Sequence, residues 1–256
     1  MSDTEMQPRA EPLAGSLATV GLSKSFGGVR AVDDATVTFL PGKINAVIGP
    51  NGSGKTTYFN CVTGMIKPDS GSVSYRGNDI TGRPPHRIAQ AGIGRSFQLC
   101  RIFPRMTVLE NMLVSVRSGT VLGKLVSARQ RTDIDRAREL LTRVGIDHLE
   151  HAEARDLSYG QQKLLELAGV LMADPETIML DEPAGGVNPA LIDRIGGLVR
   201  TLNSEGKTFL IVEHNMDMIM SLSDHIVVFD RGSPIAAGAP EVVQDDPRVL
   251  EAYLGV

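Results

Sequence analysis

The amino-acid sequence predicts an α/β fold built around a mostly parallel sheet. Short apolar runs at 44–48, 177–180, 209–212 and 226–229 have the length and composition of buried strands. Stretches with helical spacing of apolar residues separate the last three of these runs, and strands that alternate with helices pair in parallel. The chain has 256 residues, which is enough for one large domain with its own core.

The N-terminal residues 1–16 are expected to form a flexible acidic tail, since they lack the basic start and apolar core of a secretion signal. The region 17–48 is predicted to form short strands, with a turn at Pro41-Gly42. A helix is predicted over 56–63, and Gly64 is its stop. We therefore expect a single domain over 17–256.

The middle of the chain is predicted to be a helical insertion. Two helices are expected there, over 132–144 and 158–172, because apolar residues recur at helical spacing. In the first helix these residues are Ile134, Ala137, Leu140, Leu141 and Val144, and Gly145 follows them. The insertion divides the domain into an α/β core of 17–96 and 166–256 and a helical subdomain of 97–165.

The α/β alternation continues to the C-terminus. Asn188-Pro189 is typical of a helix start, because asparagine caps helices well and proline suits the first helical position. A further helix is predicted over 216–222, and the turn at 230–232 leads into a last short strand.

Composition excludes some classes of function. The chain has 26 basic and 30 acidic residues and a formal net charge of −4, whereas a nucleic-acid-binding domain is normally basic. No apolar run approaches the roughly 20 residues that span a bilayer. Cys61 and Cys100 have no closely spaced Cys or His partners and are expected to be reduced thiols. These features predict a cytoplasmic location.

A phosphate-binding loop follows the first buried strand. Residues 49–56 fit the pattern G-x-x-x-x-G-K-[ST]. They are Gly49, Pro50, Asn51, Gly52, Ser53, Gly54, Lys55 and Thr56. Glycines let successive backbone N–H groups point at phosphate oxygens, and the following helix adds the positive end of its dipole. We expect Lys55 to neutralise the β- and γ-phosphates, Thr56 to bind Mg²⁺ and Thr57 to contact the α-phosphate.

Two adjacent carboxylates end the buried strand at 177–180. Asp181 and Glu182 lie at the edge where open α/β sheets bind ligands. Asp181 is expected to hold Mg²⁺, directly or through water, and Glu182 to orient the attacking water. The alternative is a solvated turn, and the phosphate-binding loop favours the catalytic interpretation. The loop and the two carboxylates thus predict that the chain binds a nucleoside triphosphate with Mg²⁺ and hydrolyses it. GTPases, kinases and transport ATPases share such a loop, so the remaining motifs decide among them.

The segment 157–162 connects these motifs to a family. It contains Ser158, Tyr159, Gly160 and Gln161 and resembles the L-S-G-G-Q signature of the ABC-transporter ATPases, with Tyr159 in place of the first glycine. The resemblance implies that Ser158, Gly160 and Gln161 contact ATP held by the opposite subunit. The simpler alternative is that Ser158 only caps a helix.

Three further residues match positions of that family. The resemblance implies that Gln98 binds Mg²⁺ and senses a membrane partner, that His214 contacts the γ-phosphate, and that Phe26 stacks on adenine. Each has a simpler alternative, as a surface residue or as part of the core. The implied fold is a P-loop NTPase core with an N-terminal antiparallel β part and an inserted helical subdomain. The catalytic residues are then Lys55, Glu182 and His214, and the metal ligands Thr56, Gln98 and Asp181.

Within the family, the chain is similar to the branched-chain amino-acid importer ATPases, and to the larger of their two paired subunits. The segments 101–111, 157–162 and 251–255 carry this likeness. It implies that the chain pairs with a second ATPase subunit, or with a copy of itself, and binds two membrane permeases. A periplasmic solute-binding protein would be an indirect partner, and no nucleic-acid partner is expected. The chain would then lie at the inner face of the membrane. Since this subunit does not touch the solute, the solute could be a branched-chain amino acid or another small polar molecule.

Two alternatives stay open at this point. The chain could be a non-transport ABC ATPase that acts on ribosomes or nucleic acid, although it lacks the second module or long coiled coil usual there. The stretch 111–132 contains four basic residues and no acidic one. It could face permease loops or lipid headgroups, or be a solvated surface.

Overall fold

The computed structural model describes residues 16–96, 102–116 and 127–254. The strands are β1 (Leu17–Phe26), β2 (Val29–Phe39), β3 (Ile44–Ile48), β4 (Ser70–Tyr75), β5 (Asn78–Asp79), β6 (Ile93–Arg95), β7 (Thr177–Asp181), β8 (Thr208–Val212), β9 (His225–Asp230) and β10 (Ser233–Gly238). The helices are α1 (Lys55–Val62), α2 (Pro85–Ala91), α3 (Val108–Val114), α4 (Ser127–Val144), α5 (Tyr159–Met172), α6 (Pro189–Ser204), α7 (Met216–Leu222), α8 (Pro240–Gln244) and α9 (Pro247–Leu254). None of the helices described has both the length and the apolar character that crossing a membrane requires.

The strands form two sheets. A four-stranded antiparallel sheet has the order β2-β1-β4-β5, and a six-stranded sheet has the order β10-β9-β3-β8-β7-β6. In the larger sheet β9, β3, β8, β7 and β6 are parallel, and β10 is antiparallel to β9. The carboxyl ends of the parallel strands therefore meet at one edge, where the predicted loop and carboxylates follow them.

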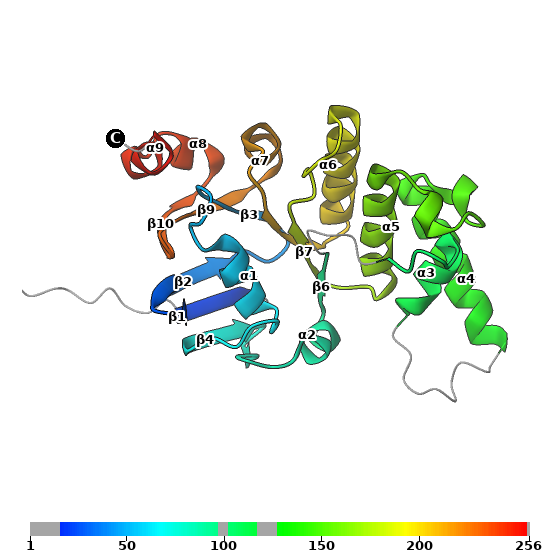
Figure 1. The fold of residues 1–256 in the computed structure, drawn as a ribbon, viewed down its shortest axis with the longest axis horizontal. Coiled ribbons are helices and arrows are strands. Elements are labelled where there is room, and N and C mark those ends of the chain that lie inside the picture. The colour runs from blue at the N-terminus through cyan, green and yellow to red at the C-terminus, as the bar shows by residue number, and fades with distance from the viewer. Residues whose placement is uncertain (1–15, 97–101, 117–126, 255–256) are drawn as a thin grey trace, which may run out of the picture.

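Both faces of the six-stranded sheet are covered, which explains why its strands are apolar throughout. On one face α1 fills the space to the antiparallel sheet. Its Tyr58 ring lies 4.9 Å from the ring of Phe229 in β9 and 6.3 Å from that of Phe39 in β2. The other face packs against helices that include α6 and α7, while α3, α4 and α5 gather at one end of the molecule (Figure 1).

Most predicted elements occur with small shifts of their ends. The helix expected over 132–144 begins earlier, at Ser127, and the helix expected over 158–172 is α5, Tyr159–Met172. Asn188 caps α6 as predicted, its side chain accepting from the Leu191 N–H at 2.9 Å. The division that we predicted at residue 165 falls inside α5, so a single helix joins the helical part to the strands of the core.

The elements α2, α3, β6, α8 and α9 were not predicted, and in segments as short as these the periodic pattern is weak. Of these, β6 matters most for the site, since it places Arg95 beside β7. Residues 1–15 of the predicted tail 1–16 and the predicted ligand Gln98 lie outside the described residues. Ser16 is not part of a tail, because it is buried and its carbonyl accepts from the Arg76 N–H at 3.0 Å.

Candidate active site

The phosphate-binding loop connects β3 to α1 and folds around the Lys55 side chain. The Lys55 ammonium donates to the carbonyl oxygens of Gly49 at 2.7 Å and Pro50 at 2.8 Å. Gly54 has φ +98°, and a Cβ there would lie 2.1 Å from the carbonyl oxygen of Ala31. Only glycine fits this position, because both the conformation and the close approach of β2 exclude a side chain.

The surroundings of the loop set the charge and the access of its polar groups. Burial lowers the pKa of Lys55 from its ordinary value, and the nearby Glu182 carboxylate opposes that shift. Thr56, the first residue after the lysine, is exposed, and Thr57 is half-buried. The loop thus holds the Lys55 ammonium in place and leaves the Thr56 hydroxyl, the predicted metal ligand, accessible.

The carboxyl ends of β7 and β8 bring two predicted catalytic residues together. The Glu182 N–H donates to the carbonyl of Val212 at 2.8 Å, which fixes the chain just after β7 beside the end of β8. His214 then lies with Nδ1 4.0 Å from the Glu182 carboxylate. The imidazole is mostly exposed and the carboxylate about one-quarter exposed. Both groups can therefore reach a ligand at this edge.

Glu213 was not predicted as a site residue, yet it holds the backbone segments after β7 and β8 together. Its side chain is fully buried, and its carboxylate accepts backbone N–H bonds from Ala184 at 2.7 Å, His214 at 2.7 Å and Asn215 at 2.9 Å. Three N–H donors stabilise a buried carboxylate without a cation. Glu213 therefore ties the turn after Glu182 to the segment of His214. The signal in the sequence was a charged residue directly after a buried strand.

Asp181 forms a buried ion pair with Arg95, a residue for which no role was predicted. Arg95 Nη2 lies 2.9 Å from Asp181 Oδ2, and the two side chains are 9% and 3% exposed. The guanidinium also donates to the Thr63 hydroxyl and lies over the Phe59 ring, 5.0 Å from its centroid. Arg95 thus joins β6 to both β7 and α1.

The second oxygen of this carboxylate suits the predicted metal. Asp181 Oδ1 is buried and has no hydrogen-bond partner within the described ranges. A buried carboxylate oxygen without a donor is costly unless a cation or an ordered water meets it. Asp181 and the exposed Thr56 hydroxyl are oxygen donors of the kind Mg²⁺ prefers, so the residues present fit the ion.

The signature segment forms the start of α5, and both of its interpretations are compatible with the structure. The Ser158 hydroxyl accepts from the Gln161 N–H at 3.3 Å, and the Gln161 side chain accepts from the Ser158 N–H at 2.8 Å. This capping box shows that Ser158 caps α5, which does not exclude a contact with ATP. Ser158 and Tyr159 are nevertheless exposed, and with Gly160 and Gln161 they line a pocket of about 470 Å³.

Phe26 lies at the end of β1, in the hairpin that packs against the phosphate-binding loop. Its side chain is 48% exposed, which excludes the alternative that it is plain core. The next strand of the hairpin contains Ala31, whose carbonyl lies against Gly54. An exposed aromatic ring on this hairpin suits the predicted stacking on adenine.

Comparison with known families shows which class of phosphate-loop protein this chain belongs to. The family model described as ABC transporter matches residues 32–185, which is more than half of the chain. The chain belongs to the ABC transporter family. A second model, described as branched-chain amino acid ATP-binding cassette transporter, matches residues 233–256 of this ABC protein.

Individual relatives agree with this assignment. The ABC chain is 41% identical over 250 residues to the high-affinity branched-chain amino acid transport ATP-binding protein LivG of Escherichia coli, covering 93% of this chain and 97% of LivG. It is 40% identical to BraF of Pseudomonas aeruginosa, with the same coverage. A nucleotide-free ATP-binding cassette from an ABC transporter superposes with a TM-score of 0.82 at 36% identity, covering 94% and 99% of the two chains.

These matches confirm the predicted ABC ATPase fold and the prediction that the chain is an ATP-binding, ATP-hydrolysing transporter subunit. Nothing among them favours an ABC ATPase that acts on ribosomes or nucleic acid. The roles of individual residues in this ABC subunit stay predictions. The contribution of the buried Arg95–Asp181 pair can be tested separately, through stability.

Replacing Arg95 by methionine is expected to lower the free energy of unfolding by about 3–5 kcal/mol, because it leaves the Asp181 carboxylate buried without its cation. Urea denaturation in EDTA measures this loss. The control is Arg76→Met, which removes an exposed pair with Glu176 and is expected to cost less than about 1 kcal/mol. Adding Asp181→Leu to the Arg95 variant should restore most of the stability. Equal effects at Arg95 and Arg76 would contradict this account of the pair.

Proposed function

We propose that this ABC subunit hydrolyses ATP to drive the import of branched-chain amino acids or a related small polar solute. The C-terminal match over 233–256 carries this proposal, because it concerns a segment beyond the general ABC model. The relatives LivG and BraF, named for branched-chain amino acid transport, support it along nearly the whole chain. The subunit works at the inner face of the membrane with two permeases and a second ATPase chain, and a periplasmic protein delivers the solute.

In the proposed mechanism, ATP binds between the loop 49–57 of one chain and the signature 157–162 of another. Lys55 neutralises the β- and γ-phosphates, Glu182 orients the water for in-line attack, and His214 stabilises the γ-phosphate. The catalytic effect comes mostly from placement and charge stabilisation. The 4.0 Å separation of His214 from Glu182 supports this division of roles.

The metal fits the same arrangement. Thr56, Gln98 and Asp181 would hold Mg²⁺, which supplies positive charge to the phosphates when it is bound. Closure of the two chains around ATP and their reopening after hydrolysis form a two-state cycle. Contacts that the nucleotide makes only in the closed state drive this cycle.

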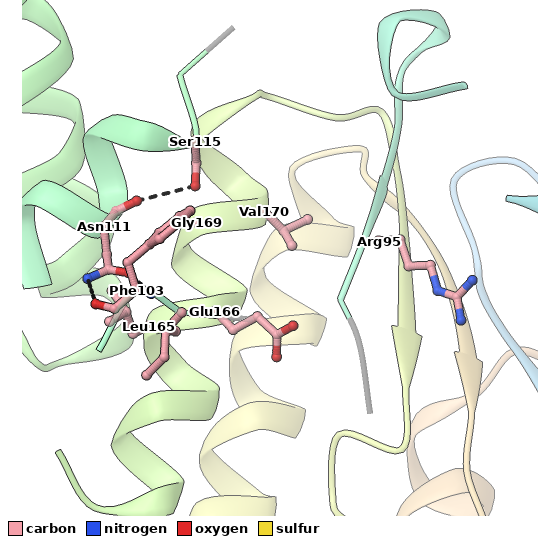
Figure 2. Close-up of a pocket in the computed structure, with 9 residues that line it drawn as sticks. Arg95, Phe103, Asn111, Ser115, Leu165, Glu166, Gly169 and Val170 are labelled. Carbon is pink, nitrogen blue, oxygen red and sulfur yellow. Dashed lines mark hydrogen bonds between the residues drawn. The ribbon is translucent and has the colours of Figure 1, made fainter. Parts of the chain in front are cut away.

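We assign the permease contact to a pocket of about 190 Å³ between β6 and the helices α3 and α5 (Figure 2). Asn111 of α3, Ser115 directly after α3 and Gly169 of α5 line it. Arg95 lies on the opposite side with its guanidinium turned away from α5 (Figure 2). Phe103 on its rim is 52% exposed, and an exposed aromatic beside a pocket is typical of an interface anchor. Two of the residues that line the pocket, Arg95 and Ile102, flank the segment that contains Gln98 in the sequence.

The test is recovery of partners from native membranes in mild detergent. We expect the wild-type chain to bring down two permeases and a second ATPase. Phe103→Ser is expected to weaken the association by roughly 30-fold, since loss of an interface anchor costs about 2 kcal/mol. The control, Val29→Ser, removes another exposed apolar side chain, 69% exposed on the β1–β2 hairpin, and should not change recovery.

Two outcomes would count against the proposal. Recovery of ribosomes in place of permeases would overturn the transport function. Full recovery of permeases by Phe103→Ser would keep transport but move the permease contact to another surface. Uptake assays with labelled leucine and with other amino acids then identify the solute.

A further inference from the structure

Lys163 occupies an unusual position for a lysine. It lies on the first turns of α5, its residue is 8% exposed, and its ammonium donates to the backbone carbonyl of Glu182 at 2.8 Å. Within 16–96, 102–116 and 127–254 it forms no ion pair with a carboxylate. A buried ammonium is costly without a carboxylate partner, so its position calls for a reason other than stability.

The group that Lys163 holds is the backbone of the residue proposed to orient the attacking water. Glu182 has φ +49°, a left-handed backbone conformation that residues other than glycine and asparagine rarely adopt. Such strain persists only where surrounding contacts impose it, and it gathers at functional sites. Here the Glu182 N–H donates to the Val212 carbonyl at 2.8 Å. The Glu182 carbonyl accepts from the Lys163 ammonium at 2.8 Å and from the Gly185 N–H at 3.0 Å.

A second contact links the same two segments. The Lys163 ammonium lies 5.5 Å from the centroid of the Tyr159 ring, within the range of a cation–π interaction. That ring also packs against the loop after Glu182, because a Cβ on Gly186 would lie 3.2 Å from it. Tyr159, which takes the place of a signature glycine, thus contacts both the lysine and the loop.

We propose that Lys163 is a positioning residue for Glu182 and that it couples the orientation of α5 to that carboxylate. The lysine does not touch ATP; it holds the Glu182 carbonyl, and the strained backbone then aims the side chain. Because α5 begins at the signature, a shift of this helix on meeting ATP in the partner chain moves the same carbonyl. This inference rests on the proposed catalytic role of Glu182.

Kinetics of the assembled transporter test the inference. Lys163→Met keeps the length of the side chain and removes its charge and donors. We expect kcat to fall roughly 10- to 100-fold, as small misplacements of catalytic groups do, with KM and nucleotide affinity within about twofold. Lys163→Arg, which keeps a cationic donor, should retain most of the activity. The control is Lys207→Met, whose ammonium also has a partner at 2.8 Å, Asp174, but lies away from the 182–185 turn.

A double-variant cycle separates positioning from a general structural effect. If Lys163 acts through the Glu182 carboxylate, then Lys163→Met adds little to the loss already caused by Glu182→Gln. Wild-type kcat in Lys163→Met, or the same fold loss in both backgrounds, would overturn the inference. If Lys163→Met does not fold, Lys163→Gln, which keeps a neutral donor, takes its place in the cycle. Absence of ATP hydrolysis in the wild-type assembly would instead refute the proposed function.

Discussion

Replacing Lys55 by alanine is expected to remove nearly all nucleotide binding and turnover. The Lys55 ammonium is enclosed by the loop, within 2.8 Å of two of its carbonyl oxygens, and the phosphates would arrive at the same place. Loss of one partner of a desolvated charge pair costs about 2–5 kcal/mol, which corresponds to roughly 30- to 5,000-fold in affinity. The effect on turnover should be at least as large, because the same charge stabilises the transferring phosphoryl group.

Titration with a fluorescent ATP analogue and an assay of phosphate release measure the two effects of Lys55→Ala. Lys67→Ala is the matched control, since Lys67 is an exposed lysine shortly after α1. Circular dichroism should show a native fold in both variants. ATP affinity within a fewfold of wild type in Lys55→Ala would refute the assignment of residues 49–57 as the phosphate-binding loop.

Glu182→Gln is expected to bind ATP with normal affinity and to hydrolyse it about 10²–10³-fold more slowly, a range typical for loss of one electrostatic group in an active site. Glutamine has the same shape and keeps a hydrogen-bond acceptor, so only the charge that polarises the water is lost. Because the closed state then persists, a dimer should accumulate in the presence of Mg·ATP. Size-exclusion chromatography and single-turnover hydrolysis measure these two results.

The control for this charge removal is Glu176→Gln, since the Glu176 side chain is 58% exposed and lies before β7 at the opposite end of the strand. It should hydrolyse ATP at the wild-type rate. Normal hydrolysis by Glu182→Gln would remove Glu182 from the mechanism and direct attention to His214, its neighbour at 4.0 Å. It would also remove the basis for a positioning role of Lys163.

Local chemistry made much of the site predictable. The glycines of the loop, the acidic end of β7 and the caps at Ser158 and Asn188 depend on residues within a few positions of each other. Parallel strands also guarantee that their carboxyl ends share an edge, so Glu182 and His214 could be expected to meet. Short elements such as β6 gave no periodic signal, and the segment with Gln98 lies outside the described residues.

The sequence by itself thus determined the phosphate-binding loop, the acidic strand end and the α/β class of the protein. Only the tertiary structure decided which charges pair across the fold: Arg95 with Asp181, 86 positions away, and Lys163 with the carbonyl of Glu182, 19 positions away. The physical reason is that these partners depend on β6 lying beside β7 and on how α5 packs next to the catalytic turn. Neither arrangement follows from the spacing of residues along the chain, because strand order and helix packing are set by the whole core.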